Sequence, residues 1–440
     1  MAAPRTDAAR RLLDEVCGPL GVRAPRLRES DVPEAVEWAR SGAMALTGRA
    51  DGPPLLVPGT PASTVRAALD LIKTRTGADL PGVGLLAERA AILGSSRRAP
   101  SSAGGAFRAV PSADGWFGLS LARPSDVEAV PALVEADDAA ADPWPAVAAW
   151  LSSRTSAVAD ERAALLGLAA APIPAHPPLN RRPGVVATVG GRRTIHDGPP
   201  LVVDFSALWA GPLCAHLLGL GGARVIKVES SARPDGARYG PPQFYDLMHG
   251  GHESVALDFA TDRATLNALV RQADVVIEAS RPRALRQLGI EAAEHVDAGT
   301  IWVSITAYGR TGDDAMRIGF GDDIAAGAGL IAWDDGLPCP AGDAIADPIT
   351  GVVAAAAACL ALRGKHGCLL DLSMHDVTAA AAQPVDASGA RVIGRRGGWA
   401  VEAGPIVEPV AAPRARRPAG RAAELGRDTA RASSAHRSPR

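Results

Sequence analysis

The sequence around Asp347 predicts the start of a helix, which would place a carboxylate at the positive end of the helix dipole. Pro348 and then Ile-Thr-Gly-Val-Val-Ala follow it, which predicts an N-cap, a proline in the first turn and an apolar helix. The helix dipole favours an ionised carboxylate at this end by about 0.3–1 kcal/mol. Aspartate is also a residue type that forms covalent intermediates as a nucleophile. The local pattern favours a helix cap, and that role does not exclude a chemical one.

The stretch from Leu201 to Glu229 is predicted to form the framework around such a site. Two apolar runs rich in β-branched residues predict strands, and the segment between them predicts a short helix that ends at Gly221 and Gly222. A strand–helix–strand unit builds a parallel sheet that binds ligands at the carboxyl ends of its strands. The loop from Ser206 to Pro212 lies at such an end but lacks G-x-G-x-x-G, so a dinucleotide site is not supported.

Length, charge and cysteine content narrow the class of protein. The 440 residues suggest two or three domains, and a net charge of −2 argues against a nucleic-acid binder with a basic surface. We expect no signal peptide and no membrane span, since no run of about 18 uncharged apolar residues occurs. The 5 scattered cysteines form no C-x-x-C pair, which predicts a reducing, cytoplasmic setting. His249 and His252 flank two glycines without a ligand pattern, so no metal site is predicted.

Six motifs in order over residues 198–380 resemble the class III CoA-transferases (CaiB/BaiF type). The first is D-x-S-x-x-x-A-G-P, from Asp204, which is followed by G-A-x-V-I-K-V-E. The others are His252–Asp258, Ala273–Glu278, Arg281–Leu285, Trp302–Gly309 and Ala346–Gly351. The family includes formyl-CoA transferase, carnitine CoA-transferase and α-methylacyl-CoA racemase. The resemblance implies an α/β fold: a Rossmann-like parallel-sheet domain with a smaller α+β part, assembled as a homodimer.

The resemblance implies an enzyme that moves CoA from an acyl-CoA thioester to a carboxylic acid. Both are substrates, and no permanently bound cofactor is implied. Asp347 matches the family nucleophile, which forms an aspartyl anhydride and then an aspartyl-CoA thioester. Backbone N–H groups near three glycines are candidates for binding an oxyanion, with an ordinary turn role as the alternative; these are Gly327, Gly329 and Gly342.

By position in the motifs, the CoA pocket is expected from loops at three strand ends. The matched residues are Trp209, Ala210, Leu257, Asp258, Phe259, Ala279, Ser280 and Arg281. Arg281, Arg233, Arg283 and Arg286 are candidates for the CoA phosphates, because guanidinium binds phosphate as a fork; solvated surface charge is the alternative. Ser230 stands where the transferases often have a basic residue, and Ala279-Ser280 replaces the usual Asn-Phe. Asp204, Lys227 and Glu229 are expected to stabilise the loops.

Two other functions stay open. An α-methylacyl-CoA racemase of the same fold needs an acid/base pair, and relatives of that kind carry a histidine in a Gly-His-Asp-like motif. Here Gly319–Ile324 has no histidine, which disfavours this alternative. A non-catalytic acyl-CoA-binding protein is the third hypothesis, because the CoA loops are altered.

The order of segments predicts two partial copies of the family fold in swapped order. Ser41–Pro54 and an alanine-rich helix resemble Ala328–Pro338 and its following helix, and residues 107–121 predict a hairpin around Asp114-Gly115. The first copy has Pro61–Thr64 where the second has Asp347, so it lacks the carboxylate. We therefore expect residues 1–171 to resemble the later half and the small domain of the family fold, and residues 172–199 to be a linker. Residues 200–381 are expected to form the CoA-transferase domain with the nucleophile, and residues 382–440 a basic, partly disordered tail.

Overall fold

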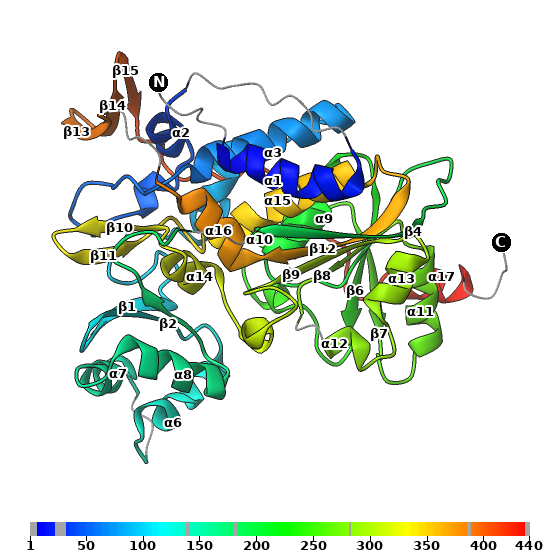
Figure 1. Ribbon diagram of the computed structural model, residues 1–440, viewed down its shortest axis with the longest axis horizontal. Coiled ribbons are helices and arrows are strands. Elements are labelled where there is room, and N and C mark those ends of the chain that lie inside the picture. Colours follow the sequence, from blue (N-terminus) through cyan, green and yellow to red (C-terminus); the bar gives the residue numbers. More distant parts are fainter. Residues whose placement is uncertain are drawn as a thin grey trace.

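A seven-stranded sheet forms the centre of the molecule in a computed structural model. The structure describes residues 7–22, 32–137, 141–179, 183–280, 283–384 and 389–435, with backbone only for 7–13 and 433–435. The strand order of the sheet is β4-β12-β9-β8-β5-β6-β7, with all neighbours parallel except the edge strand β4 (Figure 1). The α/β fold with a mostly parallel sheet is thus confirmed. The strands are β4 (Val185–Arg192), β5 (Leu201–Asp204), β6 (Arg224–Ser230), β7 (Glu253–Leu257), β8 (Val275–Glu278), β9 (Ile301–Thr306) and β12 (His366–Ser373).

Successive residues of the central strands enter two separate cores, as the two-residue period of a strand requires. Val202 faces a core shared with α1 (Asp7–Leu20), α3 (Pro61–Thr76), α9 (Ala210–Leu220) and α15 (Ala346–Ala361). Val203 faces the other core, shared with α11 (Arg263–Gln272), α12 (Arg283–Arg286) and α13 (Ala292–Asp297). Figure 1 shows these two helix groups on opposite faces of the sheet.

The strand order reverses between β5 and β8. From β5 the chain continues to β6 and β7 on one side, and from β8 it continues to β9 and β12 on the other. In open sheets of this type the crevice at the carboxyl ends of the two diverging strands is the usual ligand site. The loops after β5 and β8 are therefore the natural place for a binding site.

A small antiparallel sheet with its own helices lies beside the main sheet (Figure 1). It consists of β1 (Phe107–Ser112), β2 (Gly115–Ser120) and β3 (Ala169–Ile173), with β2 in the middle. Ser112 pairs with Gly115, which confirms the predicted hairpin. A third core, which includes the buried Trp150, joins this sheet to α6 (Val130–Val134), α7 (Trp144–Leu151) and α8 (Ser156–Leu166).

The N-terminal segment packs alongside residues 200–381, and the two alanine-rich helices of the internal similarity, α3 and α15, share one core. Each has 16 residues. Glu34 on α2 (Glu34–Arg40) accepts hydrogen bonds from the Ala62 and Ser63 amides, both at 2.8 Å, so another element supplies a carboxylate to the start of α3. The similarity does not extend to the hairpin β10 (Ile331–Asp334) and β11 (Leu337–Pro340), since its counterpart contains only the short helix η1 (Met44–Leu46).

Two predicted segments differ from the structure. The stretch 172–199, expected to be only a linker, contains β4, which pairs with β12 at the sheet edge. The tail after residue 382, expected to be partly disordered, forms β13 (Arg391–Arg395), β14 (Gly398–Ala403), β15 (Ile406–Pro409) and α17 (Thr429–Ala435). Val401 is fully buried in the main core, and Thr429 Oγ1 accepts a hydrogen bond from the Ala256 amide of β7 at 3.0 Å. Much of this tail is therefore packed on the rest of the chain.

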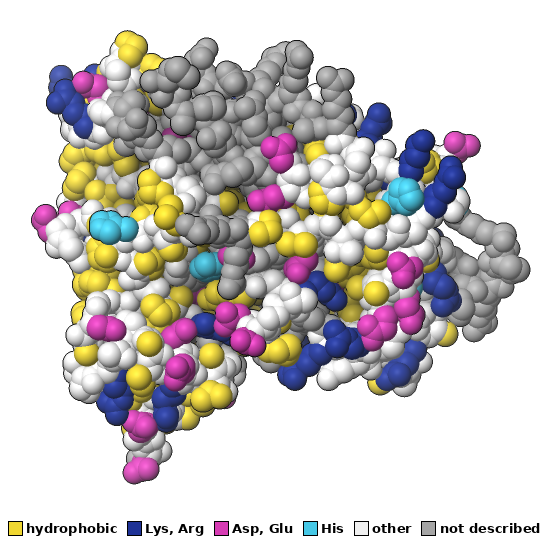
Figure 2. Space-filling model, in the orientation of Figure 1, with side chains coloured by type: hydrophobic (Ala, Val, Ile, Leu, Met, Phe, Trp, Pro, Cys, Tyr) yellow, Lys and Arg dark blue, Asp and Glu magenta, His cyan; other side chains and the backbone are white. Residues whose placement is uncertain are grey.

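The remaining helices connect these parts. They are η2 (Val83–Ala87), α4 (Glu88–Leu93), α5 (Pro124–Glu128), η3 (Gly236–Tyr239), α10 (Pro242–His249), η4 (Asp313–Met316), α14 (Gly321–Gly327) and α16 (Met374–Ala382). No helix in the described ranges is long and apolar enough to cross a membrane. On the face shown in Figure 2, basic and acidic side chains are interspersed, as the net charge of −2 suggests.

Candidate active site

Asp347 lies in the first turn of α15, two positions further into the helix than the sequence suggested. The helix begins at Ala346, and Ile345 occupies the N-cap position in place of Asp347. The Asp347 carboxylate instead accepts a hydrogen bond from the Gly321 amide at the start of α14. A Cβ atom at position 321 would lie 2.5 Å from Asp347 Oδ2 and would overlap the Ala344 carbonyl oxygen, so this approach requires glycine.

Three further aspartates surround Asp347. Asp343 precedes α15 and is fully buried, and Arg89 grips it with two hydrogen bonds, Nε to Oδ2 at 2.8 Å and Nη2 to Oδ1 at 2.5 Å. Asp322 Oδ1 accepts from the Ala344 amide at 2.8 Å. Asp323 is fully buried and accepts from Ser120 Oγ of the small sheet at 2.7 Å. Arg89 interacts electrostatically with three of these four carboxylates, those of Asp343, Asp322 and Asp347.

Burial and mutual repulsion raise the pKa of several of these carboxyl groups. Burial, with repulsion from Asp322 and Asp343, raises the pKa of Asp347 to about 7, while Arg89 and the Gly321 amide oppose the rise. The pKa of Asp322 is raised to about 6 and that of Asp323 to about 7, both chiefly by burial. The expected stabilisation of ionised Asp347 by the helix dipole is therefore outweighed, since about three pKa units correspond to about 4 kcal/mol and the dipole contributes about 0.3–1 kcal/mol.

Trp209 connects this cluster with the loop after β5. Its indole is almost completely buried, lies edge-on to Phe244 with ring centroids 5.5 Å apart, and has the Arg89 guanidinium 4.8 Å from its centroid. Ala210 is also buried, and a Cβ on Gly351 of α15 would approach its carbonyl oxygen to 2.5 Å. The structure thus brings together Trp209, Ala210 and the helix that carries Asp347.

The other predicted CoA-binding residues lie at the ends of β7 and β8. Leu257 is buried and its carbonyl oxygen accepts from the Ser231 amide at 2.9 Å, whereas Asp258 is exposed. Phe259 is half-buried and packs edge-on against Phe205, with centroids 6.5 Å apart. Ala279 is exposed and Ser280 is half-exposed; Arg281 lies outside the described residues. These positions lie at or after the carboxyl ends of parallel strands. Arg233 is exposed after β6, and Arg283 and Arg286 are exposed on α12, which follows β8.

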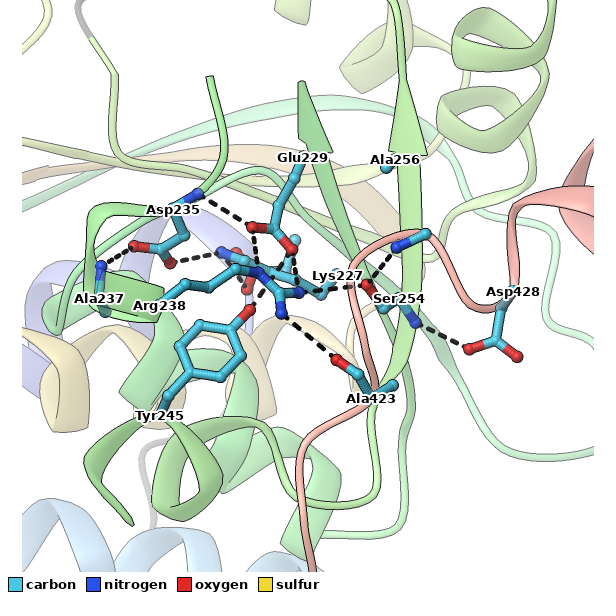
Figure 3. Close-up of polar contacts among 12 residues, drawn as sticks. Lys227, Glu229, Asp235, Ala237, Arg238, Tyr245, Ser254, Ala256, Ala423 and Asp428 are labelled. Atoms are coloured by element: carbon cyan, nitrogen blue, oxygen red, sulfur yellow. Dashed lines mark hydrogen bonds and ion pairs between the residues drawn. The ribbon is translucent and has the colours of Figure 1, made fainter. Parts of the chain in front are cut away.

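A buried ionic network fixes the loops after β5 and β6 (Figure 3). Lys227 lies 3.5 Å from Asp204 and 3.2 Å from Asp235, and its ammonium group donates to the Ser206 carbonyl oxygen. Beside it, Glu229 accepts two hydrogen bonds from another side chain of the loop, Arg238 Nε at 2.8 Å and Arg238 Nη2 at 2.5 Å. These contacts agree with the loop-stabilising role expected for Asp204, Lys227 and Glu229.

The glycines expected near an oxyanion have their amides engaged elsewhere. The Gly342 amide donates to Thr47 Oγ1 at 2.9 Å, and the Gly329 amide donates to the Ala326 carbonyl oxygen at 3.1 Å. Gly327 lies at the end of α14, where a Cβ would come within 2.7 Å of Ala171 on the small sheet. The Gly329 and Gly342 amides themselves are therefore not free for an oxyanion, and the role of the neighbouring N–H groups stays a prediction.

Sequence reasoning missed Arg89, Asp322 and Asp343 as neighbours of Asp347. Asp343 precedes Asp347 by four positions, a spacing that could have drawn attention to it. Arg89 belongs to no motif and comes from a distant segment, so no local signal pointed to it. Among the residues that the structure describes, no group of three or more His, Cys, Asp or Glu side chains is arranged to hold a metal ion.

Comparisons with known proteins place the second half of the chain among related sequences. Residues 200–404 match CoA-transferase family III. Succinate–glutarate CoA-transferase of Agrobacterium fabrum is 33% identical over 210 residues, which cover 41% of this chain and 52% of that protein. Succinyl-CoA–D-citramalate CoA-transferase of Chloroflexus aurantiacus is 30% identical over 193 residues, 40% of this chain and 48% of that protein. The chain spans about half the length of these relatives. The crystal structure of a CaiB/BaiF family protein from Brucella suis aligns with a TM-score of 0.42 at 27% identity, over 47% of this chain and 65% of that one.

Proposed function

Because residues 200–404 match CoA-transferase family III, we propose that the protein moves CoA from an acyl-CoA thioester to a carboxylic acid, with Asp347 as the nucleophile. The observation that carries this proposal is the place of Asp347. Its partly exposed carboxylate lies at the start of α15, bound to the Gly321 amide, and α15 packs on the helix that begins beside Trp209. That position adjoins the carboxyl end of β5, where the strand order predicts a ligand.

The proposed reaction needs no net proton transfer. The ionised Asp347 oxygen attacks the thioester carbonyl carbon, the C–S bond breaks, and an aspartyl anhydride and CoA thiolate form. The thiolate then attacks the Asp347 carboxyl carbon and releases the acyl group as a carboxylate, which leaves an aspartyl-CoA thioester. The acceptor carboxylate attacks this thioester and expels the thiolate, forming a second anhydride. Attack of the thiolate on the acceptor's acyl carbon gives the new thioester and regenerates Asp347.

The raised pKa of Asp347 suits the nucleophile of such a reaction. With a pKa of about 7, the carboxylate is more basic than an ordinary aspartate and is about half ionised at neutral pH. The first step requires the ionised form, so its rate should rise as the pH passes through about 7.

For CoA, we propose the loops at the carboxyl ends of β5, β7 and β8. The residues are Trp209, Ala210, Leu257, Asp258, Phe259, Ala279, Ser280 and Arg281, with Arg233, Arg283 and Arg286 as candidates for the phosphates. Support comes from the position of the described residues at one edge of the parallel sheet and from the exposure of the three described arginines. We also propose a cytoplasmic homodimer. A monomer in light scattering would contradict the dimer.

Hydroxylamine trapping tests the nucleophile. The protein is incubated with a panel of acyl-CoAs and then with hydroxylamine, which converts an aspartyl anhydride or thioester into a hydroxamate that mass spectrometry locates. We expect a hydroxamate on Asp347 that requires acyl-CoA and is absent from Asp347→Asn. An unmodified Asp347 in protein that binds acyl-CoA would contradict the covalent route.

A racemase-like activity is the second candidate, because Asp322 and Asp347 belong to one cluster and burial raises the pKa of both carboxyl groups toward neutrality. Such a pair resembles an acid and a base. Exchange of the α-proton of an acyl-CoA for deuterium, without hydroxamate formation, would favour this alternative. Binding of acyl-CoA without either reaction would favour a non-catalytic protein.

A further inference from the structure

Arg89 is a charged residue at the candidate active site that comes from outside the family-matched region. It lies on α4, in the N-terminal segment, 254 positions before its partner Asp343. Its guanidinium edge binds both Asp343 oxygens, and its face lies over the Trp209 ring at 4.8 Å. A planar, delocalised cation can make both contacts at once, which a lysine ammonium group cannot.

We propose that Arg89 is a positioning residue of the active site: it holds Asp343 and Trp209 in place beside Asp347 and keeps the Asp347 carboxylate available in its ionised form. The N-terminal segment thereby becomes part of the active site within one chain. This inference rests on the proposed role of Asp347 and assigns a partner to that residue.

A second contact supports the participation of the N-terminal segment. Thr47 Oγ1 accepts a hydrogen bond from the Gly342 amide at 2.9 Å, immediately before Asp343. Gly104 also lies against the ion pair, since a Cβ there would be 3.5 Å from Asp343 Oδ1 and 3.6 Å from Arg89 Nη2. Residues from three separate parts of the segment therefore enclose the loop that leads into Asp347.

The charges around Asp347 make the contribution of Arg89 large. Asp322 and Asp323 lie at the start of α14, and Asp343 lies just before α15. Arg89 is the cation that opposes their repulsion, and its pKa is raised by Asp343, Asp322 and Asp347, so it stays charged.

On three other elements packed on α15, the described residues offer Asp347 no unpaired cation. The first turn of α9, residues 210–213, carries no titratable side chain. On α3, Arg66 pairs with Glu37 at 3.2 Å and with Asp70 at 2.9 Å. On α16, His375 lies 3.1 Å from Asp376. Arg89 is the cation that lowers the pKa of Asp347 against the effects of burial and of the neighbouring aspartates.

The test compares the pH profile of hydroxylamine trapping in Arg89→Gln, Arg89→Lys and wild type. Loss of a neighbouring cation raises a carboxyl pKa by about 1 unit or more. For Arg89→Gln we expect the midpoint of trapping to move up by that amount, with about a fivefold loss near pH 7 that recovers by about pH 9. Arg89→Lys keeps the charge, so its midpoint should stay nearer to wild type while KM for acyl-CoA rises through the lost contact with Trp209.

Arg416→Gln is the matched control. Arg416 Nε pairs at 2.9 Å with Glu88, the residue next to Arg89, and the two arginine side chains are similarly exposed, 25% and 27%. We expect the trapping midpoint of Arg416→Gln to equal that of wild type. If Arg89→Gln folds poorly because Asp343 loses its partner, the double variant Arg89→Gln with Asp343→Asn removes both charges and takes its place.

A second measurement separates this inference from the proposed function. The pH at which the stabilisation by Asp347→Asn against urea stops increasing reports the ionisation of Asp347 in the folded protein without any reaction. This pH should be higher in the Arg89→Gln background. A higher pH in the Arg89→Gln background supports the role of Arg89 even if wild-type protein forms no hydroxamate. The absence of hydroxamate in wild type would overturn only the covalent route. Equal midpoints in both measurements, or a loss of trapping equal at every pH, would overturn the proposal.

Discussion

Replacement of Asp347 by asparagine should stabilise the protein, and more strongly at higher pH. Folding raises the pKa of this carboxyl from 3.8 to about 7, chiefly by burial. Between these values the folded protein binds more protons than the unfolded chain, so the contribution of Asp347 to stability falls as the pH rises. Asparagine has a similar shape, can still accept the hydrogen bond from Gly321, and does not titrate.

The size of the effect follows from the pKa change. About three units at about 1.4 kcal/mol per unit give an upper value of about 4 kcal/mol above pH 7. Because Asp347 is partly exposed, solvent screening reduces this figure, and we expect about 2–4 kcal/mol near pH 8. Near pH 4 the wild-type carboxyl is protonated in the folded protein and only about half ionised in the unfolded chain, so the difference should fall to about 0.5 kcal/mol.

Urea unfolding at several pH values between about 4 and 8 measures this difference, with the slope checked for equal exposure of surface on unfolding. Asp79→Asn serves as the control, because Asp79 is exposed, and substitutions of that kind usually change stability by less than about 0.5 kcal/mol. A wild-type protein that is more stable than Asp347→Asn near pH 8, or a difference that does not depend on pH, would refute the reasoning.

Two further substitutions test the surroundings of the site. Lys227→Met leaves Asp204 and Asp235 buried without their cation. We expect it to lower the free energy of unfolding, measured in urea titrations, by about 3–5 kcal/mol. A loss under about 1 kcal/mol would contradict the stabilising role of the network in Figure 3. Gly321→Ala places a Cβ atom 2.5 Å from Asp347 Oδ2, so we expect a loss of about 1–3 kcal/mol and a strong decrease in hydroxylamine trapping. Unchanged trapping would show that the contact is not needed.

Patterns confined to short stretches were predictable from the sequence. The strand–helix–strand unit appears as β5, α9 and β6, because continuous apolar runs between turn residues specify buried parallel strands almost unaided. The hairpin around Asp114-Gly115 has the same local origin, since its turn residues fix the pairing. The start of α15 was predicted to within two residues, though Ile345 and not Asp347 is the N-cap.

Segments that depend on a distant partner were not predictable in this way. β4 is mostly exposed, and its strand structure depends on pairing with the edge of β12, so no buried apolar run announces it. The tail has a basic composition typical of mobile segments, but Val401 on β14 is buried in the main core formed by residues far earlier in the chain. Composition describes the average of a segment, whereas burial of a few side chains decides whether it folds.

The sequence by itself determined the α/β class, the motifs that resemble CoA-transferase family III and the identity of Asp347 as the residue to examine. Only the tertiary structure placed Arg89 against Asp343 and Trp209, because these contacts join segments that share no local pattern. It also decided the pKa of about 7 for Asp347. Burial and the distance between charges set that value, and both exist only once the chain is folded.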